Sequence, residues 1–171
     1  MIRQDLLMEF WIRLCLLRKN NIYGASQMLF IGIDTSAYTT SVALVDQEKQ
    51  LIWEKRQLLK VKSGERGLAQ SEAFFQHIQN LPGIIKSIPR NLWKQIAAVA
   101  VSEAPRPVES SYMPVFTAGI AIATTIASTL EVELFKTTHQ EGHIAAGEES
   151  AKMLDTTEFL AFHVSGGTTE L

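Results

Sequence analysis

The spacing of apolar positions changes along the chain, and the change separates a strand-rich segment from one in which helices and strands alternate. Three short runs, separated by polar turns such as residues 34–40, have the pattern of strands. These runs are residues 29–33, 41–45 and 51–59. Charged positions in the third run indicate that one of its faces is partly solvated. The pattern predicts an antiparallel meander of three strands.

Beyond residue 68 the apolar spacing becomes helical. The first predicted helix carries Phe74, Ile78, Leu81 and Ile85 on one face, and Pro82 next to Gly83 predicts a break or kink in it. Residues 96–101 then form a continuous apolar run, which is typical of a buried parallel strand.

The remaining segments continue the alternation. Residues 115–130 are helical in pattern and rich in small side chains, with Pro114 at the position favoured for a first helical residue. Residues 132–137 are predicted to form a strand. The sequence Thr138-x-x-Glu141 is a capping box that opens a helix ending near residue 152. Residues 159–164 form a last predicted strand.

The predicted order is therefore β-β-β-α-β-α-β-α-β, an α/β fold with the element order of an RNase H-like layer. We expect residues 28–138 to form this RNase H-like first lobe. Residues 139–171 are interpreted as a histidine-bearing helix followed by the truncated start of a second lobe, because a new strand and a glycine-rich loop begin there.

Residues 1–27 are set apart by their pattern. Apolar side chains recur in them at helical spacing, at Leu6, Leu7, Phe10, Trp11, Leu14 and Leu17. This indicates either an amphipathic helix packed on the domain or on a partner, or a translated leader before a natural start at Met28. We favour the leader, because strand patterning begins only after Met28. Charged residues interrupt this segment, and no apolar run reaches the roughly 20 residues of a membrane span.

Composition limits the function classes only moderately. Of 171 residues, 46% are hydrophobic and 20% charged, as in an ordinary globular domain, and the formal net charge is -2. Overall charge therefore does not indicate a nucleic-acid binder. With Cys15 as the one cysteine, a disulfide within the chain and a cysteine-based zinc cage are both excluded. This cysteine usage fits a cytoplasmic protein.

The first candidate site follows the first predicted strand. Asp34, Thr35 and Ser36 place a carboxylate and two hydroxyls at a strand end. Such a turn can hold a hydrated metal ion or bind phosphate through its backbone N–H groups. The alternative is purely local, because Asp and Ser also start turns through their own hydrogen bonds.

The second candidate is the pair His139 and His143. Residues at i and i+4 share one face of a helix, so the two rings can bind one metal ion. The positive end of the helix dipole favours neutral, metal-ready rings at this position. The alternative is two exposed histidines, and two ligands alone do not close a metal site. His77 and His163 are interpreted as a helix-surface residue and a packed strand residue.

The third candidate is the loop Ser165-Gly166-Gly167, which follows the last predicted strand. Its glycines allow close approach of a ligand, and successive N–H groups can bind an anion. A simple β-turn would use the same residues.

Together, these three motifs resemble the tRNA threonylcarbamoyl-transferase family, formerly called O-sialoglycoprotein endopeptidase or glycoprotease. The resemblance extends from Met28 to Leu171, about the amino-terminal half of a member. It implies an actin-like ATPase fold of two RNase H-like lobes. It also implies transfer of a threonylcarbamoyl group from its adenylate to a tRNA adenosine, with iron or zinc in the cleft between the lobes.

The resemblance also implies roles for individual residues. His139 and His143 match the family's metal ligands, and Ser165, Gly166 and Gly167 match the loop that contacts ATP or the acyl-adenylate. The chain differs from the family at residues 64–68 and 104–109, and Thr168 stands where the family has a histidine. These differences predict a divergent paralogue.

Two alternatives to a transferase remain. A non-catalytic paralogue would act as a scaffold and dimerise with the true transferase as a partner subunit; the altered loops favour it and the histidine pair opposes it. A metallopeptidase, the family's old label, lacks a general base beside the histidines in a usual arrangement. We expect the parent protein to be the transferase and the 171-residue chain itself to be inactive.

Overall fold

A five-stranded mixed sheet lies at the centre of the computed structural model, which describes residues 28–36, 38–62, 64, 67–151, 163–164 and 169–170. The strand order is β3-β2-β1-β4-β5. The strands are β1 (Leu29–Asp34), β2 (Thr39–Asp46), β3 (Leu51–Leu58), β4 (Ile96–Ala104) and β5 (Glu133–Thr138). The helices are α2 (Gln70–Lys86), α3 (Val115–Leu130) and α4 (His139–Ala151), with a short 3-10 turn at Trp93–Gln95. A separate antiparallel pair joins β6 (His163–Val164) to β7 (Thr169–Glu170).

The predicted meander is confirmed, because β1 pairs antiparallel with β2, and β2 pairs antiparallel with β3. The predicted parallel strands are also confirmed: β4 runs parallel to β1, and β5 runs parallel to β4. The described elements follow the predicted order of α/β alternation. Because β1, β4 and β5 are parallel, their carboxyl ends meet at one edge of the sheet.

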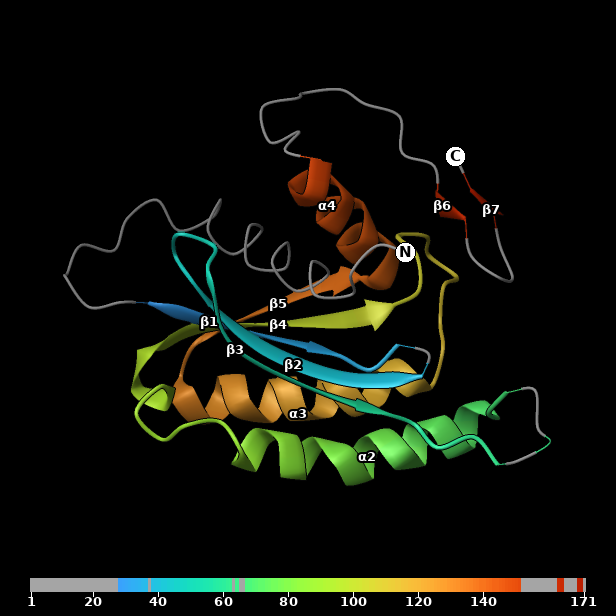
Figure 1. The fold of residues 1–171 in the computed structure, drawn as a ribbon, viewed down its shortest axis with the longest axis horizontal. Coiled ribbons are helices and arrows are strands. Elements are labelled where there is room, and N and C mark those ends of the chain that lie inside the picture. The colour runs from blue at the N-terminus through green and yellow to red at the C-terminus, as the bar shows by residue number, and fades with distance from the viewer. Residues whose placement is uncertain are drawn as a thin grey trace.

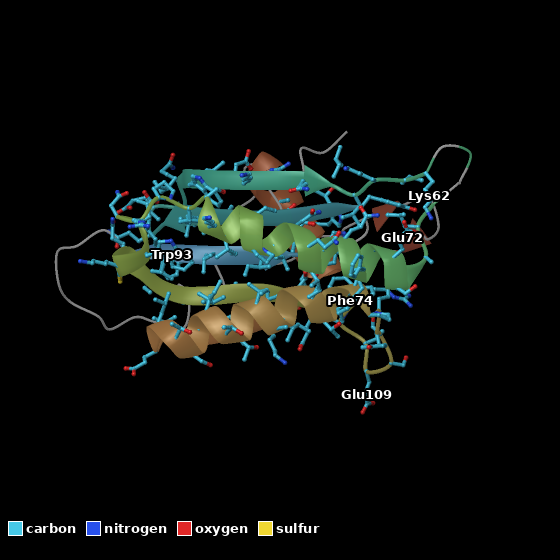
Figure 2. The ribbon with its side chains drawn as sticks, turned by 90° about the horizontal axis from the view of Figure 1, so that it is seen from below. Lys62, Glu72, Phe74, Trp93 and Glu109 are labelled. Atoms are coloured by element: carbon cyan, nitrogen blue, oxygen red, sulfur yellow. The ribbon has the colours of Figure 1, made fainter. Side chains whose placement is uncertain are left out.

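The helices cover opposite faces of this sheet. Helices α2 and α3 lie together below it, and α4 lies above it at the carboxyl ends of β4 and β5 (Figure 1). A view from below shows α2 and α3 side by side across the strands (Figure 2). Apolar side chains from the sheet and these two helices, among them Ile33, Val101 and Leu81, form the larger core.

Strand alternation decides which side chains reach α4. In β1, Ile31 and Ile33 belong to the core beneath the sheet, whereas Phe30 belongs to the cluster on the opposite face. Alternate residues of a strand point to the same face of the sheet, so Asp34, four residues after Phe30, points to the α4 face. The same argument directs Ser102 of β4 to that face, because Val101 belongs to the core beneath the sheet.

One local interpretation is wrong, and a second is narrowed. His77 was predicted on the helix surface, but it is fully buried, and its Nδ1 lies 2.8 Å from the Thr40 hydroxyl oxygen. Helix α2 continues through Pro82 to Lys86, so of the predicted break or kink, the break does not occur. The inner face of α2 stays packed on the sheet beyond the proline, at Ile84, and packing outweighs the lost backbone bond.

Some predictions lie outside the described residues, namely those for residues 1–27 and most of the predicted strand 159–164. Within the described part of the chain, no helix is both long and apolar enough to span a membrane.

Candidate functional site

A buried carboxylate stands at the carboxyl edge of the sheet, where β1 ends. Asp34 Oδ1 accepts a short hydrogen bond from the hydroxyl of Ser102, at the matching position of β4. The Ser36 hydroxyl donates to Asp34 Oδ2 at 2.6 Å, and the Ser36 backbone N–H donates to Oδ1 at 3.3 Å. His139 of α4 completes the surroundings, with its Nδ1 3.6 Å from Asp34 Oδ2. Elements distant in sequence therefore converge on one carboxylate.

The electrostatics of Asp34 favour its ionised form. Burial raises the pKa of this carboxyl, but His139, through its contact and, when protonated, its charge, and the hydroxyls of Ser102 and Ser36 together lower the pKa more, from 3.8 to about 2. Hydrogen bonds to the charged form account for this direction. Asp34 is therefore a fixed negative charge beneath the first turn of α4.

The two histidines of α4 face each other, as the i, i+4 spacing predicted. Their Nε2 atoms are 2.9 Å apart, and the rings meet edge to face with centroids 4.4 Å apart. Two ring nitrogens that bind one ion at about 2.0–2.1 Å each lie about 2.9–3.4 Å apart at ligand angles of about 90–109°. The separation of the Nε2 atoms fits a pair of ligands to one ion.

The predicted capping box fixes the start of α4. Glu141 Oε2 accepts from the Thr138 backbone N–H at 2.7 Å and from the Thr138 hydroxyl at 2.8 Å, and the Glu141 N–H donates back to that hydroxyl at 3.3 Å. Burial raises the pKa of Glu141, but bonds from Thr137 and Thr138 lower it overall. The Gln140 N–H donates to the carbonyl of Pro105 at 3.0 Å, in the loop after β4. These bonds hold the first turn, and with it His139, against the sheet edge.

Thr35 faces away from this cluster. Its hydroxyl is buried, donates to the carbonyl of Val115 at 2.8 Å and accepts from the N–H of Gly119 at 3.3 Å. A Cβ added at Gly119 would lie 2.9 Å from this hydroxyl oxygen. Thr35 thus ties β1 to a close approach of α3, and its hydroxyl already has protein partners.

Ser165, Gly166 and Gly167, predicted to bind the acyl-adenylate, lie outside the described residues, so their roles remain predictions. Across the described ranges, no group of three or more His, Cys, Asp or Glu side chains has an arrangement that could hold a metal ion. Asp34, Ser36, His139 and His143 are the predicted site residues that the structure brings together.

Sequence reasoning missed Ser102. The residue could have been found, because Ser102 comes directly after Val101, just as Asp34 comes directly after Ile33. The two strands are parallel neighbours with Ile33 opposite Val101, so Ser102 and Asp34 point to the same face of the sheet. The set Ser102, Asp34 and His139 does not form a nucleophilic triad, since the Ser102 hydroxyl donates to the carboxylate and not to a histidine. What the cluster can do is hold His139 in one orientation with Nε2 directed at His143.

Known proteins resemble the chain over most of its length. A tRNA N6-adenosine threonylcarbamoyltransferase of Methanopyrus kandleri is 27% identical over 149 residues, covering 84% of this chain and 41% of that protein. The enzyme of that name from Persephonella marina is 30% identical over 149 residues, again with 84% and 41% covered. The resemblance inferred from the motifs is thus confirmed: these transferases are homologues, and the chain spans about two fifths of their length.

A solved structure is also similar to part of the chain. The solved structure of YeaZ from Pseudomonas aeruginosa is similar over 65% of this chain and 44% of its own, at a TM-score of 0.46 and 16% identity. No protein-family model matches the chain.

Proposed function

We propose that this homologue of the tRNA N6-adenosine threonylcarbamoyltransferases supplies part of the active site for the same transfer, that of a threonylcarbamoyl group from its adenylate to a tRNA adenosine. The observation that carries the proposal is the pair of Nε2 atoms, 2.9 Å apart, at the carboxyl edge of the parallel strands. Ligands of open α/β sheets bind at this edge. The fold we propose for the whole protein is an actin-like pair of RNase H-like lobes.

His139 and His143 would hold a divalent ion, iron or zinc, through Nε2. A bound ion of this kind supplies a Lewis acid that polarises or positions the carbamoyl oxygen. Two ring nitrogens do not complete a coordination shell, so we propose that further ligands come from a part of the protein beyond the described residues.

Other residues of the chain would bind and position the nucleotide. The backbone N–H groups of Ser165, Gly166 and Gly167 would contact the phosphate of the acyl-adenylate or of ATP. The tRNA needs cationic residues on the rim of the site, and with a formal net charge of -2 this chain has no overall positive charge to attract it. We therefore propose that a second lobe or a paralogous partner subunit supplies them.

The test is an assay of transfer. Full-length protein, alone and with its partner subunits, receives tRNA, threonylcarbamoyl-adenylate and Zn²⁺ or Fe²⁺, and the tRNA is digested and searched for modified adenosine by mass spectrometry. We expect product that depends on added metal. Absence of product under every condition contradicts the proposal and favours the non-catalytic scaffold, for which the divergent loop at residues 104–109 is the supporting observation.

A further inference from the structure

A carboxylate that contacts a metal-ligating histidine can act without touching the ion. Metal-ligating histidines usually donate their second ring N–H to a carboxylate or carbonyl, which fixes the tautomer and the ring orientation. Asp34 stands in this relation to His139: its Oδ2 lies 3.6 Å from Nδ1, while Nε2 on the opposite side of the ring faces His143.

We propose that Asp34 is a positioning residue, which holds His139 as the Nδ1–H tautomer and so keeps the Nε2 lone pair directed at the ligand position. This departs from the expectation that Asp34 contacts the nucleotide or a hydrated ion directly. The positioning role of Asp34 rests on the proposed function only in assuming that His139 binds a metal ion.

The chemistry of the acceptor supports this assignment. An ionised carboxylate only accepts hydrogen bonds, so a neutral imidazole that faces it does so best with its N–H. If Nδ1 carries the proton, Nε2 is unprotonated and can bind a metal. The distance of 3.6 Å is slightly beyond hydrogen-bond range, and contacts of this kind often tighten when the ligand arrives.

Asp34 itself is held in place by the sheet. Ser102 from β4 and Ser36 from the following turn occupy its remaining acceptor positions, and the residue is 7% exposed. A carboxylate fixed by bonds on both oxygens can fix a ring in turn, whereas a mobile one cannot. The serines therefore act on His139 through Asp34.

Replacement of Asp34 by asparagine puts a hydrogen-bond donor in place of the acceptor that faces His139. The Ser36 backbone N–H points at Oδ1 and needs an acceptor there, so the asparagine oxygen must take the Oδ1 position. Its NH₂ group then faces Nδ1, which must accept, and the proton moves to Nε2. Nε2 loses the lone pair that would bind the ion.

Asp46→Asn is a matched control. Asp46 is also buried, at 6% exposure, and its Oδ1 accepts from the backbone N–H groups of Glu48 and Gln50. It pairs with Leu29 at the opposite end of β1 from Asp34. This variant reports the general effect of the exchange of a buried aspartate for asparagine.

The test uses the full-length protein, which includes the further metal ligands of the proposed function, freed of metal with a chelator and kept at a pH at which its imidazoles are neutral. Long-range ¹H–¹⁵N spectra report the tautomer of His139, and titration with Zn²⁺ alone gives the affinity. We expect Nδ1–H at His139 in the wild type, Nε2–H in Asp34→Asn, and Zn²⁺ affinity about 10- to 100-fold lower in that variant. Asp46→Asn should change neither quantity.

A His139 tautomer that is unchanged in Asp34→Asn overturns the inference, as does an unchanged Zn²⁺ affinity after the tautomer has switched. Full-length protein that shows the switch on substitution but binds no Zn²⁺ in its wild-type form supports the positioning role of Asp34 and contradicts the metal site of the proposed function. The two hypotheses therefore fail separately.

Discussion

The contact between α3 and the turn after β1 makes a quantitative prediction for Gly119→Ala. The new methyl group would lie 2.9 Å from the Thr35 hydroxyl oxygen and 3.4 Å from Cγ2 of Thr35 and of Val101. Thr35 is fully buried and bonded to α3, so it has little room to move. Overpacking of this kind costs about 1–3 kcal/mol, whereas alanine gains about 0.5–1 kcal/mol over glycine in a helix.

Gly83→Ala separates the two effects. Gly83 lies within α2, and a Cβ there meets nothing within 4 Å, so this variant receives the helical gain without the clash. Both variants receive the same gain in helix propensity, so this gain cancels when their free energies of unfolding are compared. Gly119→Ala should therefore be less stable than Gly83→Ala by about 1–3 kcal/mol. Urea unfolding followed by circular dichroism measures the difference. Equal stabilisation of the two variants would refute the close packing of α3 on Thr35.

Further predictions concern the cap and the core. Glu141→Ala removes the acceptor for the N–H and hydroxyl of Thr138 and should destabilise the chain by about 0.5–2 kcal/mol, whereas Glu141→Gln keeps an acceptor and should lose less; equal losses in urea unfolding would argue against the cap. Leu81→Ala empties a fully buried position of α2 and should cost about 2–5 kcal/mol. Phe75→Ala, on the exposed face of the same helix, should change stability by no more than about 0.5 kcal/mol, and a comparable loss for both variants would contradict the burial pattern.

The order of elements was predictable because the apolar period is strong and local. The period of two before residue 59 and the helical spacing after residue 68 each correspond to one face of an element against the sheet. The capping box also predicted the start of α4 to within a residue, since its bonds join neighbours in sequence.

Features that depend on tertiary packing were not predictable in this way. His77 has a polar side chain on a helix, and only the fold shows that it faces Thr40 of β2. The meeting of Asp34 with Ser102 depends on the parallel register of β1 and β4, across a separation of 68 residues. A hydroxyl that follows a strand can bind a ligand or bond to the protein itself, so the sequence did not show which of these Thr35 does. Its hydroxyl bonds to the carbonyl of Val115, which lies 80 residues away in the sequence.

The proposed function requires that His139 and His143 act together as metal ligands for the transfer. The most direct test compares wild-type full-length protein with the double variant His139→Ala, His143→Ala. After both are incubated with the same excess of Zn²⁺, bound metal is measured, and so is modified adenosine formed from tRNA and threonylcarbamoyl-adenylate. If the two histidines hold the metal ion, we expect the double variant to stay folded, to lose bound metal and to form no product. Product formed at the wild-type rate by the double variant would contradict the proposed function.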